Sequence, residues 1–191
     1  MVRNADATRL RILEAAEIEF AERGFSGARV DRIAEASGSN KRMIYVYFDD
    51  KVGLFDATLH RSISRLIEAV PITEDDLPGY GVRLFDYLVE HPEALRLTSW
   101  RQLESPGAGP EVSTLYEEKV AAMRTMRSAS GEAPAVIAPT DLLVLVQGMA
   151  GSWLNSPLDL LLAGDANPMS ARRLSAHRAA LYEAITRLVG S

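Results

Sequence analysis

The chain has 191 residues, of which 47% are hydrophobic and 25% are charged, and it has no cysteine. This composition excludes a globally disordered chain and a fibrous repeat, and the missing cysteine excludes a disulfide framework, a thiolate metal site and a cysteine nucleophile. Because the net charge is −5, any contact with nucleic acid must come from a local basic patch.

Apolar residues recur at spacings of three and four, which predicts an all-α protein of about nine helices. The expected helices run over about 8–23, 30–36, 41–47, 51–69, 81–90, 92–103, 111–128, 140–156 and 170–189. The longest uncharged stretch, 142–158, has 17 residues with several polar ones among them, so we expect a buried helix there and no membrane span. The N-terminus has no apolar signal core, and the composition fits a reducing cytoplasm.

The first helix is expected to end at Gly24, because glycine adopts the left-handed conformation that helix ends often need. Two short helices follow, separated by the turn-forming residues 37–40, and this arrangement predicts a helix-turn-helix. Ala34 would lie where the two helices cross, Gly38 would supply a positive φ, and Ile44 would anchor the second helix. A generic helix hairpin is the alternative reading of this spacing. Beyond the second short helix, residues 49–50 are both aspartates and are expected to cap the next helix.

The second short helix carries the basic surface that DNA binding requires. Residues 36–48 contain no carboxylate but include Lys41 and Arg42, although the first 60 residues as a whole have 9 basic and 10 acidic side chains. Positive charge against phosphate supplies most of the non-specific affinity for DNA. Tyr45 and Tyr47 can place a hydroxyl on a phosphate and a ring against a sugar or a thymine methyl. Core packing is the alternative role for both tyrosines.

The run ARVDRIAEASGSNKRMIYVYFDDKVGLF at 28–55 resembles the DNA-binding signature of the tetracycline-repressor (TetR) family, and RILEAA at 11–16 with FAERGF at 20–25 resembles its first helix. The resemblance implies an N-terminal three-helix DNA-binding domain over residues 6–66, with the helix-turn-helix at about 29–48. It also implies a C-terminal helical ligand-binding and dimerisation domain over residues 70–191. Members of this family are mostly repressors that leave their operator when a small molecule binds.

The residue types and the resemblance together predict a set of DNA-binding residues on and around the second short helix. These are Arg29, Ser39, Asn40, Lys41, Arg42, Tyr45, Tyr47 and Lys51. Two positions depart from the family pattern: Ala28 replaces a threonine that often caps the first helix of the motif, and Ser39 replaces a common valine. We therefore expect the missing cap to come from another residue, such as Ser26.

Aromatic and isolated polar residues in the C-terminal two-thirds predict a ligand site. The candidate lining residues are Tyr87, Trp100, Tyr116, Met123, Gln147 and Trp153. Residues of these types also form ordinary helical cores, which is the alternative reading. Since this part of the chain has no cluster of like charges, we expect a neutral or weakly charged, largely apolar effector.

The last two expected helices predict a homodimer. Gly148 and Gly151 are three residues apart and would let two helices approach closely, and the last helix has an apolar stripe that includes Leu174, Leu181 and Ile185. In the TetR family the corresponding helices form a four-helix bundle across a two-fold axis. Tight packing within one chain is the alternative.

The sequence contains no pattern typical of an enzyme. His60, His91 and His177 have no partner at a metal-site spacing and are expected to be surface or capping residues, and no nucleophile elbow, P-loop or dinucleotide fingerprint occurs. Neither cofactor nor metal is expected. The sequence therefore predicts a ligand-responsive transcriptional regulator, most often a repressor, whose partners are double-stranded operator DNA, a second copy and a small-molecule effector. A small helical ligand-binding protein or enzyme that does not act on DNA and an architectural DNA binder without an effector are the alternatives.

Overall fold

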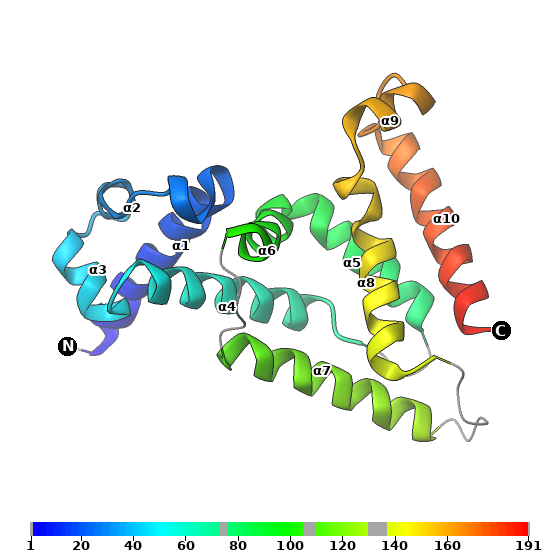
Figure 1. Ribbon diagram of the computed structural model, residues 1–191, viewed down its shortest axis with the longest axis horizontal. Helices are drawn as coiled ribbons and strands as arrows, with labels where there is room; N and C mark the ends of the chain where they lie inside the picture. Colours follow the sequence, from blue (N-terminus) through cyan, green and yellow to red (C-terminus); the bar gives the residue numbers. More distant parts are fainter. Residues whose placement is uncertain (1, 73–75, 105–109, 130–136, 191) are drawn as a thin grey trace. The chain divides into compact units, whose positions relative to one another are not determined.

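The computed structural model describes residues 2–72, 76–104, 110–129 and 137–190, and all regular elements in these ranges are α-helices (Figure 1). The all-α fold class is therefore confirmed. The helices are α1 (Val2–Gly27), α2 (Val30–Ala36), α3 (Lys41–Phe48), α4 (Lys51–Ala69), α5 (Leu77–Glu90), α6 (Pro92–Glu104), α7 (Pro110–Ala129), α8 (Pro139–Asn155), α9 (Leu158–Gly164) and α10 (Ala171–Val189).

Ten helices are described where the sequence predicts about nine. The additional helix is α9, whose seven residues are too few to display a helical period in the sequence. The start of the helix expected over about 81–90 also differs, because α5 already begins at Leu77. Asp76 caps this helix by accepting the Gly79 N–H at 2.7 Å, and a proline in the first turn costs no hydrogen bond.

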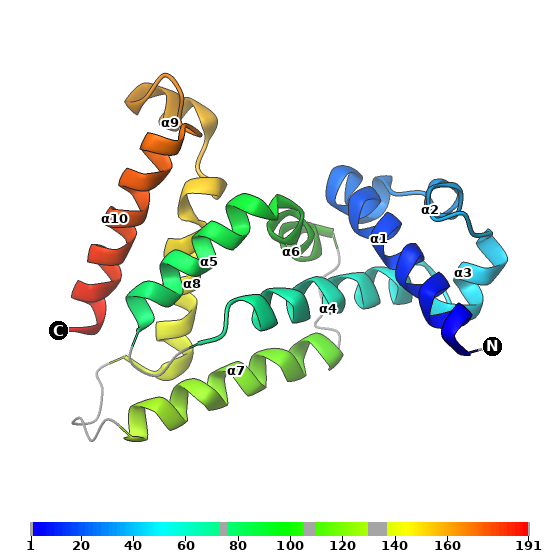
Figure 2. The same ribbon diagram turned by 180° about the vertical axis from the view of Figure 1, so that it is seen from behind.

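The chain forms two compact units. The first comprises Met1–Ile67 and His91–Leu115, so α6 joins the N-terminal helices although it lies far from them in sequence. Phe20, Phe25 and Phe55 pack together at the centre of its core, with ring centroids 4.9 to 6.3 Å apart. Both ribbon views show α2 and α3 lying against α1 (Figures 1 and 2). This core holds the two short helices in a fixed orientation.

The second unit comprises Glu68–Glu90 and Tyr116–Ser191, and its core forms where α5, α8 and α10 pack together. Gly81 on α5 makes the close approach possible, because a Cβ at that position would lie 2.2 Å from the Ile185 Cδ1. Leu174, Leu181 and Ile185 of α10 are buried in this core. The predicted apolar stripe of the last helix is therefore used within the chain.

Candidate nucleic-acid interface

The turn between α2 and α3 has the geometry expected from the sequence. Gly38 has a φ of +62°, and its N–H bonds to the Glu35 carbonyl at 3.1 Å while the Ser39 N–H bonds to the Ala34 carbonyl at 2.9 Å. This pair of bonds is a Schellman motif, which ends a helix with a glycine in the left-handed region. Ala34 and Ile44 are both buried. A helix-turn-helix is therefore present, and the orientation of α3 is set by buried contacts.

The cap of α2 differs from the prediction. The N-cap residue Arg29 makes no side-chain cap, and Ser26 supplies none; instead a carboxylate from α1, Glu19, accepts the Arg29 N–H at 2.9 Å and the Arg32 Nε at 2.8 Å. Burial raises the pKa of Glu19, but the Arg32 hydrogen bond, the Arg29 N–H and the charges of Arg32 and Arg23 together outweigh it, so the pKa is lowered. Glu19 thus fixes the start of α2 to α1.

The N-terminus of α3 is capped by its own sequence. The Asn40 Oδ1 accepts the Met43 N–H at 2.8 Å, so the side-chain amide group of Asn40 is left as a donor for a DNA phosphate. Lys41 pairs with Asp31 at 3.1 Å, and both side chains are largely exposed. The Asp31 hydrogen bond raises the pKa of Lys41, which is therefore charged at neutral pH. Arg42 is exposed, and no described residue pairs with it.

The predicted DNA-binding residues differ in exposure. Five are exposed and three are half-buried: Arg29, Asn40, Lys41, Arg42 and Tyr45 in the first group, Ser39, Tyr47 and Lys51 in the second. Tyr45 stands out from α3 with 38% of its surface exposed, whereas Tyr47 packs against the core of the unit. The alternative role of core packing therefore applies in part to Tyr47.

Lys51 is positioned by the core. Its Nζ lies 4.8 Å from the centroid of the Phe25 ring and 3.5 Å from the Ser26 carbonyl oxygen. Burial lowers the pKa of Lys51. The contacts with Phe25 and Ser26 limit the reach of its ammonium group. A cation held over an aromatic face is oriented before the ligand arrives. This arrangement suits a fixed phosphate contact.

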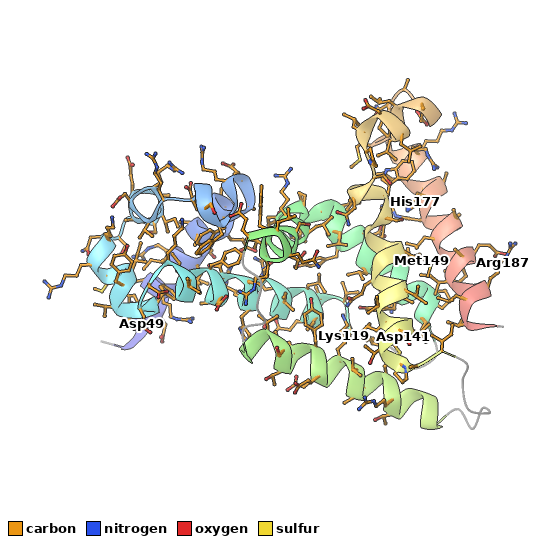
Figure 3. All side chains as sticks on the ribbon, viewed as in Figure 1. Asp49, Lys119, Asp141, Met149, His177 and Arg187 are labelled. Carbon is orange, nitrogen blue, oxygen red and sulfur yellow. The ribbon has the colours of Figure 1, made fainter. Side chains whose placement is uncertain are left out.

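The corner between α3 and α4 is tight and strained. Asp49 has φ +64° and ψ −58°, and the Asp50 N–H bonds to the Phe48 carbonyl at 2.7 Å, which makes a γ-turn centred on a non-glycine residue (Figure 3). Gly53 lies so close that a Cβ would come within 2.2 Å of the Phe48 oxygen. Asp50 caps α4 by accepting the Gly53 N–H at 2.8 Å, as expected. The turn therefore fixes the angle between α3 and α4.

Sequence reasoning missed several residues that the structure brings to this surface. On α1, the Arg9 guanidinium lies 5.2 Å from the Phe48 ring centroid and the Arg11 Nε donates to the Ser37 carbonyl at 3.4 Å. On α3, Met43 and Val46 are exposed, and Val46 has 69% of its surface free. Arginines extend the basic surface, and an exposed valine can contact a thymine methyl. Of these residues, only Met43 and Val46 could have been identified from the sequence, because they are apolar side chains on an otherwise polar helix face.

The candidate effector-site residues divide between the two units. Trp100 belongs to the first unit, where its Nε1 donates to the Ala21 carbonyl at 3.3 Å. Trp153 packs in the second unit against His177, with ring centroids 4.8 Å apart, and the Arg173 guanidinium lies 4.3 Å from its ring. His177 therefore lies among aromatic rings and is not a capping residue. The remaining candidates, Tyr87, Tyr116, Met123 and Gln147, also belong to the second unit.

No helix in the described ranges is long and apolar enough to cross a membrane. Likewise, among the residues with described placement, no group of three or more histidine, aspartate or glutamate side chains is arranged to hold a metal ion.

Comparisons with known proteins agree with this geometry. A model described as bacterial regulatory proteins of the tetR family matches residues 12–58, and a tetracyclin repressor-like C-terminal domain matches residues 76–187. The HTH-type transcriptional repressor SCO4008 of Streptomyces coelicolor is 41% identical over 155 residues, which are 79% of this chain and 80% of that protein. The HTH-type transcriptional repressor NicS of Pseudomonas putida is 33% identical over 142 residues, 71% of this chain and 62% of its own.

A solved structure has the same fold over nearly the whole chain. It is the crystal structure of the putative transcriptional regulator SCO4942 from Streptomyces coelicolor, with a TM-score of 0.78 and 34% identity. The similarity covers 95% of this chain and 97% of that one, so it includes both compact units.

Proposed function

We propose, from the premise that this chain belongs to the TetR family of transcriptional regulators, that it is a dimeric repressor released from its operator by a small effector. We assign operator binding to residues 6–66, and effector binding and dimerisation to residues 70–191. The protein acts in the cytoplasm, where its operator DNA lies.

One observation carries the DNA-binding role. Helix α3 presents Arg42, Tyr45 and Val46 to solvent on a face without a carboxylate, while Ile44 and Phe48 hold its opposite face in the core. A recognition helix needs this division, because base contacts specify a sequence only when phosphate contacts and packing fix the register. Neither a ligand carrier nor a small enzyme accounts for this exposed cationic helix.

The dimer surface that we propose differs in composition from the stripe expected in α10. Val144, Gly148 and Ser152 lie one turn apart on the exposed face of α8, and Tyr182 of α10 is 49% exposed. Both ribbon views show α8 and α10 side by side, with α9 joining them at one end (Figures 1 and 2). Leu158, Leu160 and Leu162 of α9 are also exposed. Apolar side chains gathered on neighbouring helices in this way favour an interface between copies.

In a two-fold dimer, the same surface of each copy forms the interface. The surface on α8 and α10 can meet this requirement by packing against α8 and α10 of the second copy. Dimerisation places two α3 helices at a fixed separation, and operator half-sites must lie about one helical turn, ~34–36 Å, or a multiple apart. An effector that changes this separation lowers operator affinity.

The effector site that we propose lies in the second unit and includes Tyr87, Tyr116, Met123, Gln147 and Trp153; the sixth candidate, Trp100, belongs to the first unit. A ligand that releases DNA must bind the DNA-free protein more tightly than the DNA-bound one, by the same factor as it weakens DNA binding. Its largely apolar character follows from the residues that line this unit.

A footprint across the promoter region next to the protein's own gene tests the proposal. We expect a protected, two-fold symmetric site that disappears at higher salt, because phosphate contacts dominate the affinity. A library of small molecules added to the bound complex then tests release. Protection with no releasing compound would favour an architectural DNA binder, and no protection at any DNA segment would contradict the proposal.

A further inference from the structure

A buried lysine without a counter-ion lies in the second unit. Lys119 of α7 is only 6% exposed, and no carboxylate or hydrogen-bond acceptor among the described residues pairs with it (Figure 3). Its Nζ lies 5.0 Å from the centroid of the Tyr80 ring on α5. Burial lowers the pKa of Lys119 to about 8, so at neutral pH most molecules still carry the charge. Lysines are almost never this buried unless they are paired.

A second buried polar group, the Tyr80 hydroxyl, lies at the same place. It is fully buried, and its contact with the Gln147 side chain falls outside regular hydrogen-bond geometry within the described part of the chain. Burial raises the pKa of Tyr80 to about 12, while hydrogen bonding to the neighbouring Gln147 side chain of α8 lowers it. Of the other polar groups nearby, Tyr116 raises this pKa and Arg83 lowers it, but Arg83 already pairs with Asp76 at 2.9 Å. Lys119 is the cation left unpaired here.

Apolar side chains accompany both groups. Met123 lies one helical turn after Lys119 and Leu84 lies one turn after Tyr80, and both are buried. Val146, next to Gln147 on α8, is fully buried as well. A few convergent polar groups among apolar ones are typical of sites for small molecules that have both characters.

A ligand anion would give Lys119 a counter-ion and would give the Tyr80 hydroxyl a well-placed hydrogen-bond acceptor. An unpaired buried charge is costly, and the cost is removed when an opposite charge with acceptor oxygens arrives. A carboxylate carries one negative charge, which one lysine balances, and its second oxygen can accept the Tyr80 hydroxyl. A phosphate monoester carries ≈ −1.5 to −2 at pH 7 and would leave negative charge buried.

We propose that Lys119 and Tyr80 bind the carboxylate of an otherwise apolar effector, so that the regulator responds to an organic acid. This proposal rests on the effector site of the proposed function and adds the chemical class of the ligand to it. Tyr80 and Lys119 are residues that the sequence did not single out, because neither the burial of one lysine nor its missing partner is visible in a sequence.

Calorimetry on the full-length protein without DNA tests the ligand class. The probes are octanoate, decanoate and 4-phenylbutanoate, each compared with the alcohol of the same carbon skeleton. At least one acid should bind more than about tenfold more tightly than its alcohol, as a charge-assisted hydrogen bond requires. Equal binding of every acid and its alcohol, or no binding by any acid, would overturn the proposal.

Substitution separates ligand binding from a structural role. Lys119→Met removes the charge and keeps the chain length, so the acid preference should disappear while the melting temperature of the ligand-free protein stays equal or rises. A lysine retained for its contact with the Tyr80 ring would instead give a lower melting temperature and unchanged acid binding, which would contradict the proposal. Tyr80→Phe keeps the ring and should weaken acid binding about threefold to tenfold. Arg172→Met, which removes an exposed charge from α10, is the control.

The chain has only three lysines, at positions 41, 51 and 119, so lysine-selective NMR resolves each side chain. The acid that binds should raise the pKa of Lys119 and leave those of the other two unchanged. An unchanged Lys119 titration at saturating acid would overturn the proposal. Because these measurements use no DNA, they test the acid site separately from operator release. Acid binding that fails to release the operator would contradict only the effector role. Operator release by neutral compounds alone would contradict only the acid site.

Discussion

Side chains that contact phosphate and side chains that contact bases should respond differently to substitution. Tyr45→Phe removes one hydroxyl and Lys51→Ala removes one cation, so each should weaken binding to operator and unrelated DNA alike, by about twofold to tenfold. Arg42→Ala should also reduce the discrimination between the operator and a single-base variant, because Arg42 is exposed and has no described partner. Fluorescence anisotropy with the operator, its single-base variant and an unrelated duplex measures these affinities.

The control for these variants is the melting temperature, since Lys51 also lies over the Phe25 ring. Operator affinity equal to wild type for the Tyr45→Phe/Lys51→Ala double variant would contradict the assignment of α3 and the start of α4 to the interface.

The strained turn at the end of α3 predicts a stabilising substitution. Asp49→Gly relieves a positive φ that costs of order 1–3 kcal/mol, and loses part of this gain to the greater freedom of glycine in the unfolded chain. We expect a net increase of about 1 kcal/mol in the free energy of unfolding, measured by urea denaturation. Asp50→Gly serves as the matched comparison and should destabilise the protein, because it removes the cap of α4.

Glu19 should make the first unit sensitive to acid. Its folded-state pKa lies below the ordinary value of 4.5, so its contribution to stability is fully present above pH 4.5 and is lost as the pH falls through the lowered pKa. Urea denaturation at pH 7 and at pH 3 should show a loss that is smaller in Glu19→Gln, which has no charge to lose. An equal loss in both proteins would show that Glu19 does not stabilise α2.

Residue patterns predicted part of this detail. Gly38, Ala34 and Ile44 have the roles that their spacing indicates, because a helix-turn-helix imposes local sterics that act within a dozen residues. The Glu19 cap and the unpaired Lys119 could not be predicted, since each depends on which distant residues the folded chain brings near. The γ-turn at Asp49 is an exception to a local rule, and strain of this kind is held in place by the surrounding packing.

At the scale of helices, α8 offers a direct probe of the dimer. A Cβ at Gly148 would meet no atom within 4 Å, so Gly148→Arg leaves the fold of one chain intact. In the proposed dimer the arginine enters the interface, and the dissociation constant should rise at least about thirtyfold, as a ~2 kcal/mol interface lesion does. Analytical ultracentrifugation measures it.

The comparison variant for the dimer is Gln102→Arg, an exposed position on α6 that adds the same side chain to the first unit. A Gly148→Arg protein that dimerises as tightly as this control would contradict the interface. Gly151 is unsuitable as a probe, because it is buried within its own chain.

Helix boundaries and faces were predictable to different degrees. Long amphipathic helices such as α4 and α10 are readable because their period repeats over many residues. The sequence assigns the apolar stripe of α10 to an interface between copies, but Leu181 and Ile185 pack inside the chain. An apolar stripe shows that a face is buried and does not say against which neighbour.

At the scale of the whole molecule, the claim that unites these observations is that two copies present their α3 helices to two half-sites on one face of DNA. The family of the chain was predictable from about 28 consecutive residues, since the geometry of a recognition helix constrains so many of them. The chemistry of the effector was not, because the proposed site draws on α5, α7 and α8, which are separated in sequence.

The most direct test of this claim is the affinity of the wild-type protein for its footprinted operator and for a duplex with five base pairs inserted between the half-sites. Five base pairs rotate one half-site by about half a turn, so a rigid dimer can then hold only one half-site. We predict that the insertion weakens binding at least about hundredfold and that insertion of ten base pairs weakens it less. Equal affinity for the operator and for the five-base-pair insertion would contradict the account.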